Sequence, residues 1–212
     1  MKSITVIAGM LIVSSFVLAS PPEIPETPAA VDDVLYARTF TLEEPFKFVW
    51  CKERPNVTAG TLLVLEVDKA LVVPRSVAMP VLYVGDQSAQ RINSGHKSGH
   101  VIAIVPGEVD LTKVPIWFGT PDLPGRADAK EARSERALAE KAGIKPFSKE
   151  KVKAAQDKGG ARLALVDISA LLRDHVAELI LEYCPDEKHL AEDFRRPVLT
   201  KPKPKKPADD DD

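Results

Sequence analysis

The chain has 212 residues, with 29 Lys and Arg against 31 Asp and Glu, and a formal net charge of −2. This length suits one ordinary domain with appendages, and the near-neutral charge argues against a general nucleic-acid binder or membrane-surface binder. Eighteen prolines together with only 6% aromatic residues predict many turns and extended segments.

Residues 1–19 are typical of a secretory signal peptide. Lys2 precedes an apolar run from Ile4 to Leu18, and the small residue Ala19 marks the expected cleavage site. The run has about fifteen residues, fewer than the roughly 20 that a membrane-spanning helix needs. We therefore predict a cleaved signal and an exported protein, periplasmic or extracellular, with no transmembrane segment after cleavage. The alternative is an uncleaved N-terminal anchor with the rest of the chain outside.

Two further segments lack the pattern of a folded domain. Residues 20–33 contain four prolines and no apolar periodicity, which predicts an extended Pro-rich linker. The chain ends in KPKPKKPADDDD, and this composition predicts a disordered tail over 197–212. Folded structure is therefore expected over 34–196.

Residues 34–125 have the pattern of a β-rich domain. The triplet Glu43-Glu44-Pro45 separates the first two of several short apolar runs. The runs lie between clusters of Gly, Pro, Asn and Asp, at 35–41, 46–51, 61–67, 81–84, 101–105 and 114–118. Runs of this length and spacing, without interleaved helical periodicity, predict a mostly antiparallel β-sandwich-like body.

Residues 126–196 predict a helical portion packed on the β-rich domain. The segment 127–142 has alternating charges and almost no apolar face, with Leu138 as its only large apolar residue, so a surface helix is expected there. Ser148 can cap a second helix that ends at the following Gly-Gly pair. A third helix carries an apolar stripe that must be buried against the sheet. The stripe contains Ile168, Leu171, Leu172, His175, Val176, Leu179, Ile180 and Tyr183. Together with the β-rich body, these helices give an α+β fold.

The chain has two cysteines, Cys51 and Cys184. In an oxidising compartment two cysteines most simply form one disulfide bond. An unstrained bond closing a loop of about 130 residues would stabilise the folded state by on the order of 4–5 kcal/mol. It would join an early strand to the end of the third helix. The alternative is two buried free thiols, and nothing near either residue supplies the base that a catalytic cysteine needs.

His96 and His100 are the candidate metal ligands. They lie in a glycine-rich loop between two predicted strands. Two imidazoles four residues apart can share a metal when a helix aligns them, but this loop is not helical, and a zinc site needs a third ligand. The alternative places His96 exposed in the loop and His100 at the start of a strand. His175 is expected at the edge of the core. No cofactor is predicted.

No catalytic residue is predicted. Ser98 lies one place away from the spacing of a G-x-S-x-G nucleophile motif, and a predicted strand rather than a helix follows it. The chain also lacks a phosphate-binding loop, a dinucleotide fingerprint and an HExxH zinc motif.

Two features are candidate contact surfaces. Trp117 and Phe118 precede a turn-rich loop and would offer an apolar surface if exposed; burial in the core is the alternative. Residues 126–160 carry an excess of positive charge. That excess would suit an anionic cell-wall polymer, whereas a solvated helix laced with ion pairs is the alternative.

These patterns predict an exported, non-enzymatic binding or structural protein of the cell envelope or exterior. The sequence does not identify its partner. Another envelope protein or an anionic cell-wall polymer fits the predicted exported location, and nucleic acid does not. The alternative is a secreted, metal-dependent hydrolase that uses His96 and His100.

Overall fold

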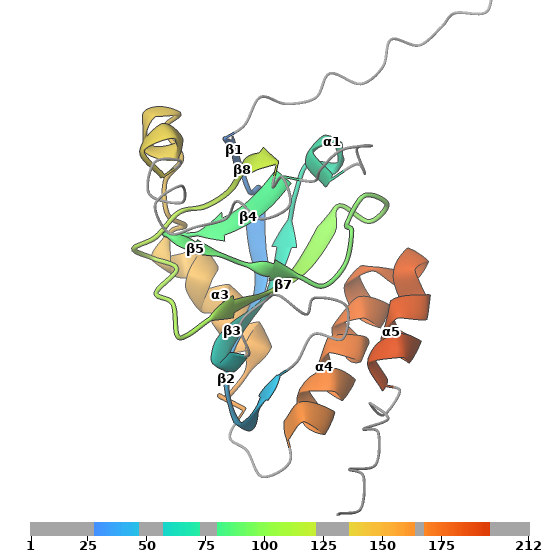
Figure 1. Cartoon of the computed structure of the whole chain (residues 1–212). Coiled ribbons are helices and arrows are strands. Elements are labelled where there is room, and N and C mark those ends of the chain that lie inside the picture. Colours follow the sequence, from blue (N-terminus) through green and yellow to red (C-terminus); the bar gives the residue numbers. More distant parts are fainter. Residues whose placement is uncertain (1–27, 47–56, 73–79, 122–135, 164–167, 196–212) are drawn as a thin grey trace, which may run out of the picture.

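A computed structural model describes residues 28–46, 57–72, 80–121, 136–163 and 168–195. They form two antiparallel sheets, with the helices mostly in the C-terminal half (Figure 1). The predicted α+β class, with a β-sandwich-like body and a helical C-terminal portion, is confirmed. The predicted signal peptide, the predicted tail and Cys51 lie outside the described residues. Within those residues, none of the helices is both long enough and apolar enough to span a bilayer.

The first sheet has the strand order β2, β3, β7, β6, and every pair is antiparallel. Its strands are β2 (Asp33–Phe46), β3 (Val57–Glu66), β7 (His100–Pro106) and β6 (Gln90–Arg91). The central strands β3 and β7 contain the runs LLVL and VIAIV, whose side chains are all fully buried. A continuous apolar run fits a strand whose sheet is covered on both faces.

The second sheet packs on one face of the first. Its strands, in spatial order, are β1 (Ala29–Ala30), β8 (Ile116–Pro121), β4 (Pro80–Val84) and β5 (Gln87–Ser88). Leu82 and Phe118 of this sheet share a core with Leu63 and Val101 of the first. The short helix α1 (Lys69–Val72) contributes Leu71 and Val72 to the same core. Two sheets with one shared core make the sandwich.

Helices cover the other face of the first sheet. Figure 1 shows α4 (Ile168–Tyr183) and α5 (Lys188–Arg195) side by side, joined by the single 3-10 turn η1 (Pro185–Glu187). Val176 and Ile180 of α4 and Phe194 of α5 pack with Leu62 and Ile102. Five residues of the predicted stripe are buried as expected, namely Leu172, Val176, Leu179, Ile180 and Tyr183, whereas Leu171 is 54% exposed and His175 is half-buried. The helix α5 was not predicted.

The free edge of β2 is covered by α3 (Lys149–Gly159) and the residues after it. The predicted cap is present, because the Ser148 hydroxyl accepts a hydrogen bond from the Lys151 N–H at 3.3 Å. Gly159 approaches so closely that a Cβ there would lie 2.1 Å from the Ala37 carbonyl oxygen. Beyond the helix, the Leu163 N–H donates to the Thr39 carbonyl at 3.1 Å. These contacts protect an edge that could otherwise pair with another chain.

Two boundaries differ from the sequence predictions. β2 continues through Glu43-Glu44-Pro45 to Phe46, where a break was predicted, with a register shift between Thr41 and Phe46. The rest of the second predicted run, residues 47–51, lies outside the described residues. An irregular point on an edge strand tolerates a proline, which has no N–H to give to the ladder. β1 lies within the predicted linker, and Val31 is buried in the sandwich core. The folded body therefore begins before residue 34.

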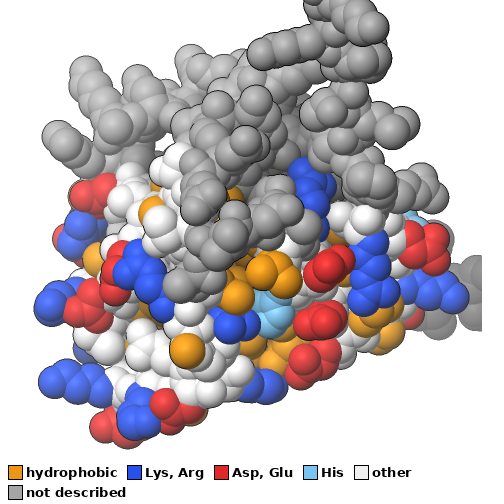
Figure 2. All heavy atoms as spheres, turned by 90° about the horizontal axis from the view of Figure 1, so that it is seen from below, with side chains coloured by type: hydrophobic (Ala, Val, Ile, Leu, Met, Phe, Trp, Pro, Cys, Tyr) orange, Lys and Arg blue, Asp and Glu red, His pale blue; other side chains and the backbone are white. Residues whose placement is uncertain are grey.

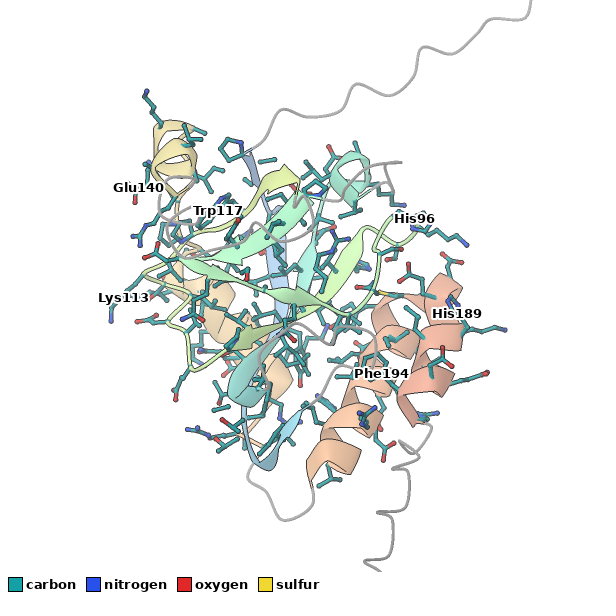
Figure 3. The ribbon with its side chains drawn as sticks, viewed as in Figure 1. His96, Lys113, Trp117, Glu140, His189 and Phe194 are labelled. Carbon is teal, nitrogen blue, oxygen red and sulfur yellow. The ribbon has the colours of Figure 1, made fainter. Side chains whose placement is uncertain are left out.

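Trp117 and Phe118 are not a contact surface, since both are 0% exposed. Adjacent residues of a strand point to opposite faces. Phe118 enters the core between the sheets, whereas Trp117 packs on the outer face with Tyr83 and Ala139. A helical turn at residues 136–141 covers that outer face beside the labelled Trp117 (Figure 3). The structure thus places both aromatics in the core.

Candidate functional site

The loop between β6 and β7 lies against the junction of α4, η1 and α5. Gly95 and Gly99 have φ angles of +75° and +76°, in the left-handed region that other residues disfavour. The Gly99 N–H donates to the Gly95 carbonyl at 2.8 Å, and the Gly99 carbonyl accepts from the Val67 N–H at 2.9 Å. The glycines therefore allow a compact turn, and side chains of this turn meet the helical layer.

Asn93 joins this loop to the strand and to the helix end. Its amide nitrogen donates to the His100 carbonyl at 2.9 Å and to the Cys184 sulfur at 3.1 Å. Its amide oxygen accepts from the Ile102 N–H at 2.8 Å. The side chain of this buried residue is thus fully used in holding the loop in place.

Cys184 is a buried free thiol at the C-terminal end of α4. Burial raises the pKa of this thiol to about 11, which keeps it in the unreactive protonated form. The Ser98 hydroxyl lies 3.6 Å from the sulfur. The structure thus has this sulfur as a free thiol, the alternative to the predicted disulfide bond; the expected partner, Cys51, lies outside the described residues, so the bond itself stays an untested prediction.

His100 has a structural role. Its Nδ1 donates to the Tyr183 carbonyl at 2.8 Å, since a carbonyl only accepts. The imidazole also contacts the Tyr183 ring edge-on, with 5.8 Å between ring centres. The interaction joins the start of β7 to the last turn of α4.

Ser94, His96 and Glu187 form a hydrogen-bonded group across 93 residues of chain. The Ser94 hydroxyl donates to Glu187 Oε1, and Ser94 Oγ lies 2.5 Å from His96 Nδ1. A hydroxyl has one proton to give, so His96 Nδ1 is the donor to Ser94. Glu187 is 5% exposed, and its Oε2 has no hydrogen-bond partner among the described residues. Its carboxylate is therefore only half satisfied.

Glu187 lies in the wall of a hollow of about 330 Å³, which we call the Glu187 hollow. Figure 3 shows His96 and His189 on the same side of the molecule, the first on the loop and the second on α5. The lining consists of Ile92, Asn93, Ser94, His96 and Lys97 from the loop side, with Asp186, Glu187, His189 and Leu190 from the helical side. Charged, hydrogen-bonding and apolar groups therefore meet in one small concavity, as in small-molecule sites.

The two candidate metal ligands have different surroundings. His96 contacts Ser94 in the hollow, whereas His100 is engaged by the Tyr183 carbonyl. Across the part of the chain that the structure describes, no three His, Cys, Asp or Glu side chains gather closely enough to hold a metal ion. The geometry gives the predicted metal site no support.

A second polar cluster lies between β2, α3 and α4. The Tyr36 hydroxyl contacts His175 Nε2 and donates to the Gly159 carbonyl at 3.4 Å. Arg38 Nη1 lies 3.5 Å from the same imidazole nitrogen, and Glu178 Oε2 lies 3.5 Å from His175 Nδ1. Burial and then Arg38 lower the pKa of His175. Burial raises the pKa of Tyr36. His175 is thus a partnered residue at the core edge, as predicted.

The structure describes part of the basic segment, and three lysines of α3 form ion pairs there. Lys151 pairs with Asp33 at 3.1 Å, and Lys158 pairs with Glu182 at 3.7 Å. Within the helix, Lys153 pairs with Asp157 at 2.5 Å. Figure 2 shows basic and acidic side chains interspersed on the face seen from below. This arrangement favours the solvated, ion-paired helix over a binding surface for an anionic polymer.

Comparison with known proteins adds no assignment. No protein-family model matches the chain, and no curated protein and no solved structure is similar to it. The case for a function therefore depends on the geometry of the site and on the sequence.

Proposed function

We propose that the protein is an exported, non-enzymatic binding protein of the cell envelope or exterior, and that it binds its ligand in the Glu187 hollow. The observation that carries the binding function is the half-satisfied carboxylate of Glu187 beside a cavity of about 330 Å³. A buried polar atom without a partner costs free energy, and a functional role is one reason for a protein to keep it. A ligand that supplied the missing donor would remove that cost.

The Ser94–His96–Glu187 group favours binding over catalysis. In a serine hydrolase the imidazole lies between the serine and the carboxylate and accepts the hydroxyl proton. Here the serine lies between the other two, and its proton is directed to Glu187. With Nδ1 of His96 acting as a donor, that nitrogen is not the base that would activate Ser94. This order of the three groups suits polar side chains that line a binding site better than side chains that catalyse hydrolysis.

Support for export comes from residues 1–19, where one charge precedes an apolar run and a small-residue cleavage site. The experiment is N-terminal sequencing of the protein recovered outside the cytosol of its host. We expect the mature chain to begin at Ser20. The matched control is Ala19→Arg, which should block cleavage there. A chain that keeps Met1 and stays in the cytosol would refute export.

The competing hydrolase function is tested on the same purified protein. Metal analysis of the wild type, His96→Ala and His100→Ala should find no stoichiometric metal in any of them. Metal present in the wild type and lost from both variants would favour the metal-dependent hydrolase instead. A fluorophosphonate probe that labelled Ser94 would favour a serine hydrolase.

A further inference from the structure

We infer that the Glu187 hollow takes a small organic cation with a primary ammonium group, and that Glu187 is its counter-charge. This inference rests on the proposed function and specifies the ligand of the same site.

One carboxylate oxygen of Glu187 lacks a hydrogen-bond donor among the described residues. One carboxylate oxygen, Oε1, accepts from Ser94, and the other, Oε2, has no donor among the described residues. His96 Nδ1 lies 3.9 Å from Oε1, beyond hydrogen-bond distance. Oε2 is itself buried, but Glu187 lines the hollow, and because the terminal torsion of a glutamate is broad and roughly two-fold, a rotation of about half a turn exchanges the two oxygens. The site therefore lacks a hydrogen-bond donor, and an acceptor would not satisfy it.

The charges that line the hollow favour a positively charged ligand. Two carboxylates, those of Asp186 and Glu187, line the hollow together with one ammonium, that of Lys97. Glu187 is 5% exposed, whereas Lys97 and Asp186 are exposed. The charge least screened by water is thus the buried negative one. A cationic ligand gains more from that carboxylate than it loses to a solvated lysine.

The lining of the hollow favours an organic ammonium ion over a metal ion. The described residues offer no group of three His, Cys, Asp or Glu side chains that could hold a metal ion. A hydrogen-bond donor is what Oε2 needs, and a primary ammonium carries three donors with its charge. Ile92 and Leu190 give the hollow an apolar part, which suits a short methylene chain. A volume near 330 Å³ lies at the lower end of small-molecule sites.

The test is a chemical-shift titration of the full chain with three probes of similar size. n-Butylamine hydrochloride should bind. Tetramethylammonium has the charge without N–H donors and should bind about tenfold more weakly. Butyrate has the chain with the opposite charge and should not bind. Equal binding of the two cations would overturn the ammonium assignment, and butyrate binding more tightly than butylamine would overturn the cation.

Matched variants test whether Glu187 is the residue that binds the ammonium group. Glu187→Gln should weaken butylamine binding about tenfold or more, because the charge-assisted hydrogen bond is lost. Glu192→Gln, which removes an exposed carboxylate of α5 outside the lining, should leave binding unchanged. If Glu187→Gln does not fold, Asp186→Asn decides, because it removes an exposed charge and should weaken binding about threefold. Wild-type affinity in a folded Glu187→Gln, or in Asp186→Asn when that variant decides, would overturn the proposal.

The outcome separates this inference from the proposed function. Butyrate binding that is lost in Lys97→Ala would refute the cation and leave a binding protein. A cytosolic, uncleaved chain would refute the exported function even if butylamine binds.

Discussion

The Tyr36–His175 cluster and the Glu187 hollow have similar positions in the fold but differ in how completely their polar groups are hydrogen-bonded. Both lie where the helical layer meets the first sheet, His175 in the first half of α4 and Glu187 after its C-terminal end. In the cluster, Tyr36 and Arg38 both reach His175. In the hollow, Glu187 Oε2 has no partner among the described residues. A closed network stabilises the fold, whereas an incomplete one at a cavity leaves a place for a ligand.

The largest effect is expected from a substitution in the closed region, by which we mean the Tyr36–His175 cluster and the adjoining contact of Gly159 with β2. Gly159→Ala would place a Cβ 2.1 Å from the Ala37 carbonyl oxygen, and backbone on both sides leaves little room to move. We expect the free energy of unfolding to fall by about 3 kcal/mol, the upper range for overpacking. Urea denaturation measures it, with the exposed Gln156→Ala of the same helix as the control, expected within about 0.5 kcal/mol. A loss in Gly159→Ala no larger than in the control would show that α3 does not dock on β2 this closely.

A smaller effect separates the two regions directly. Tyr36→Phe removes a hydroxyl that contacts His175 and Gly159, and should lower the free energy of unfolding by about 1 kcal/mol. Glu187→Gln removes a buried charge with one unpartnered oxygen and should leave stability unchanged or raise it by up to about 1 kcal/mol, the pattern of a site kept for function. Thermal and urea unfolding of both variants measure the contrast. Destabilisation of Glu187→Gln as large as that of Tyr36→Phe would mean that Glu187 is a structural residue.

The place of His175 at the edge of the core was predictable from the sequence, whereas its partners Tyr36 and Arg38 and the hollow were not. Helical spacing in α4 places His175 beside the buried Leu172 and Val176, and periodicity reads such local relations directly. Ser94 and Glu187 are separated by 93 residues and share no motif. These two residues come together because η1 and α5 follow α4, and neither element was predicted from the sequence. The only local signal was Leu190, Ala191 and Phe194 at helical spacing after Pro185.

The exposure of Trp117 and Phe118 was wrongly predicted for a related reason. Trp117 and Phe118 were candidates for an exposed surface because they precede a turn-rich loop, with burial in the core as the alternative. Both faces of β8 are covered, one by the first sheet and the other by the helical turn at residues 136–141. That turn belongs to a segment with few apolar residues, so nothing in its pattern indicated that it covers a sheet. Layering is a tertiary property, and residue pattern alone does not determine it.

The smallest expected effect is the pH dependence that His175 gives to the closed region. Burial and Arg38 lower its pKa in the folded state below the ordinary value of 6.5. As the pH falls through that ordinary value, the unfolded chain takes up a proton that the folded protein does not, so stability decreases. Above it, His175 contributes no pH dependence. Glu178 and Glu182 oppose the shift and make the decrease smaller.

Urea denaturation between about pH 7.5 and about pH 5.5 measures this dependence in the wild type and in His175→Gln. The other three histidines and the carboxylates are common to both proteins, so the difference between the two profiles isolates His175. We expect the wild type to lose more stability than the variant as the pH falls. Parallel profiles would show that His175 is no less easily protonated in the folded state than in the unfolded chain. The Tyr36–His175 contact would then lack the half-buried, neutral imidazole on which its stabilising role depends.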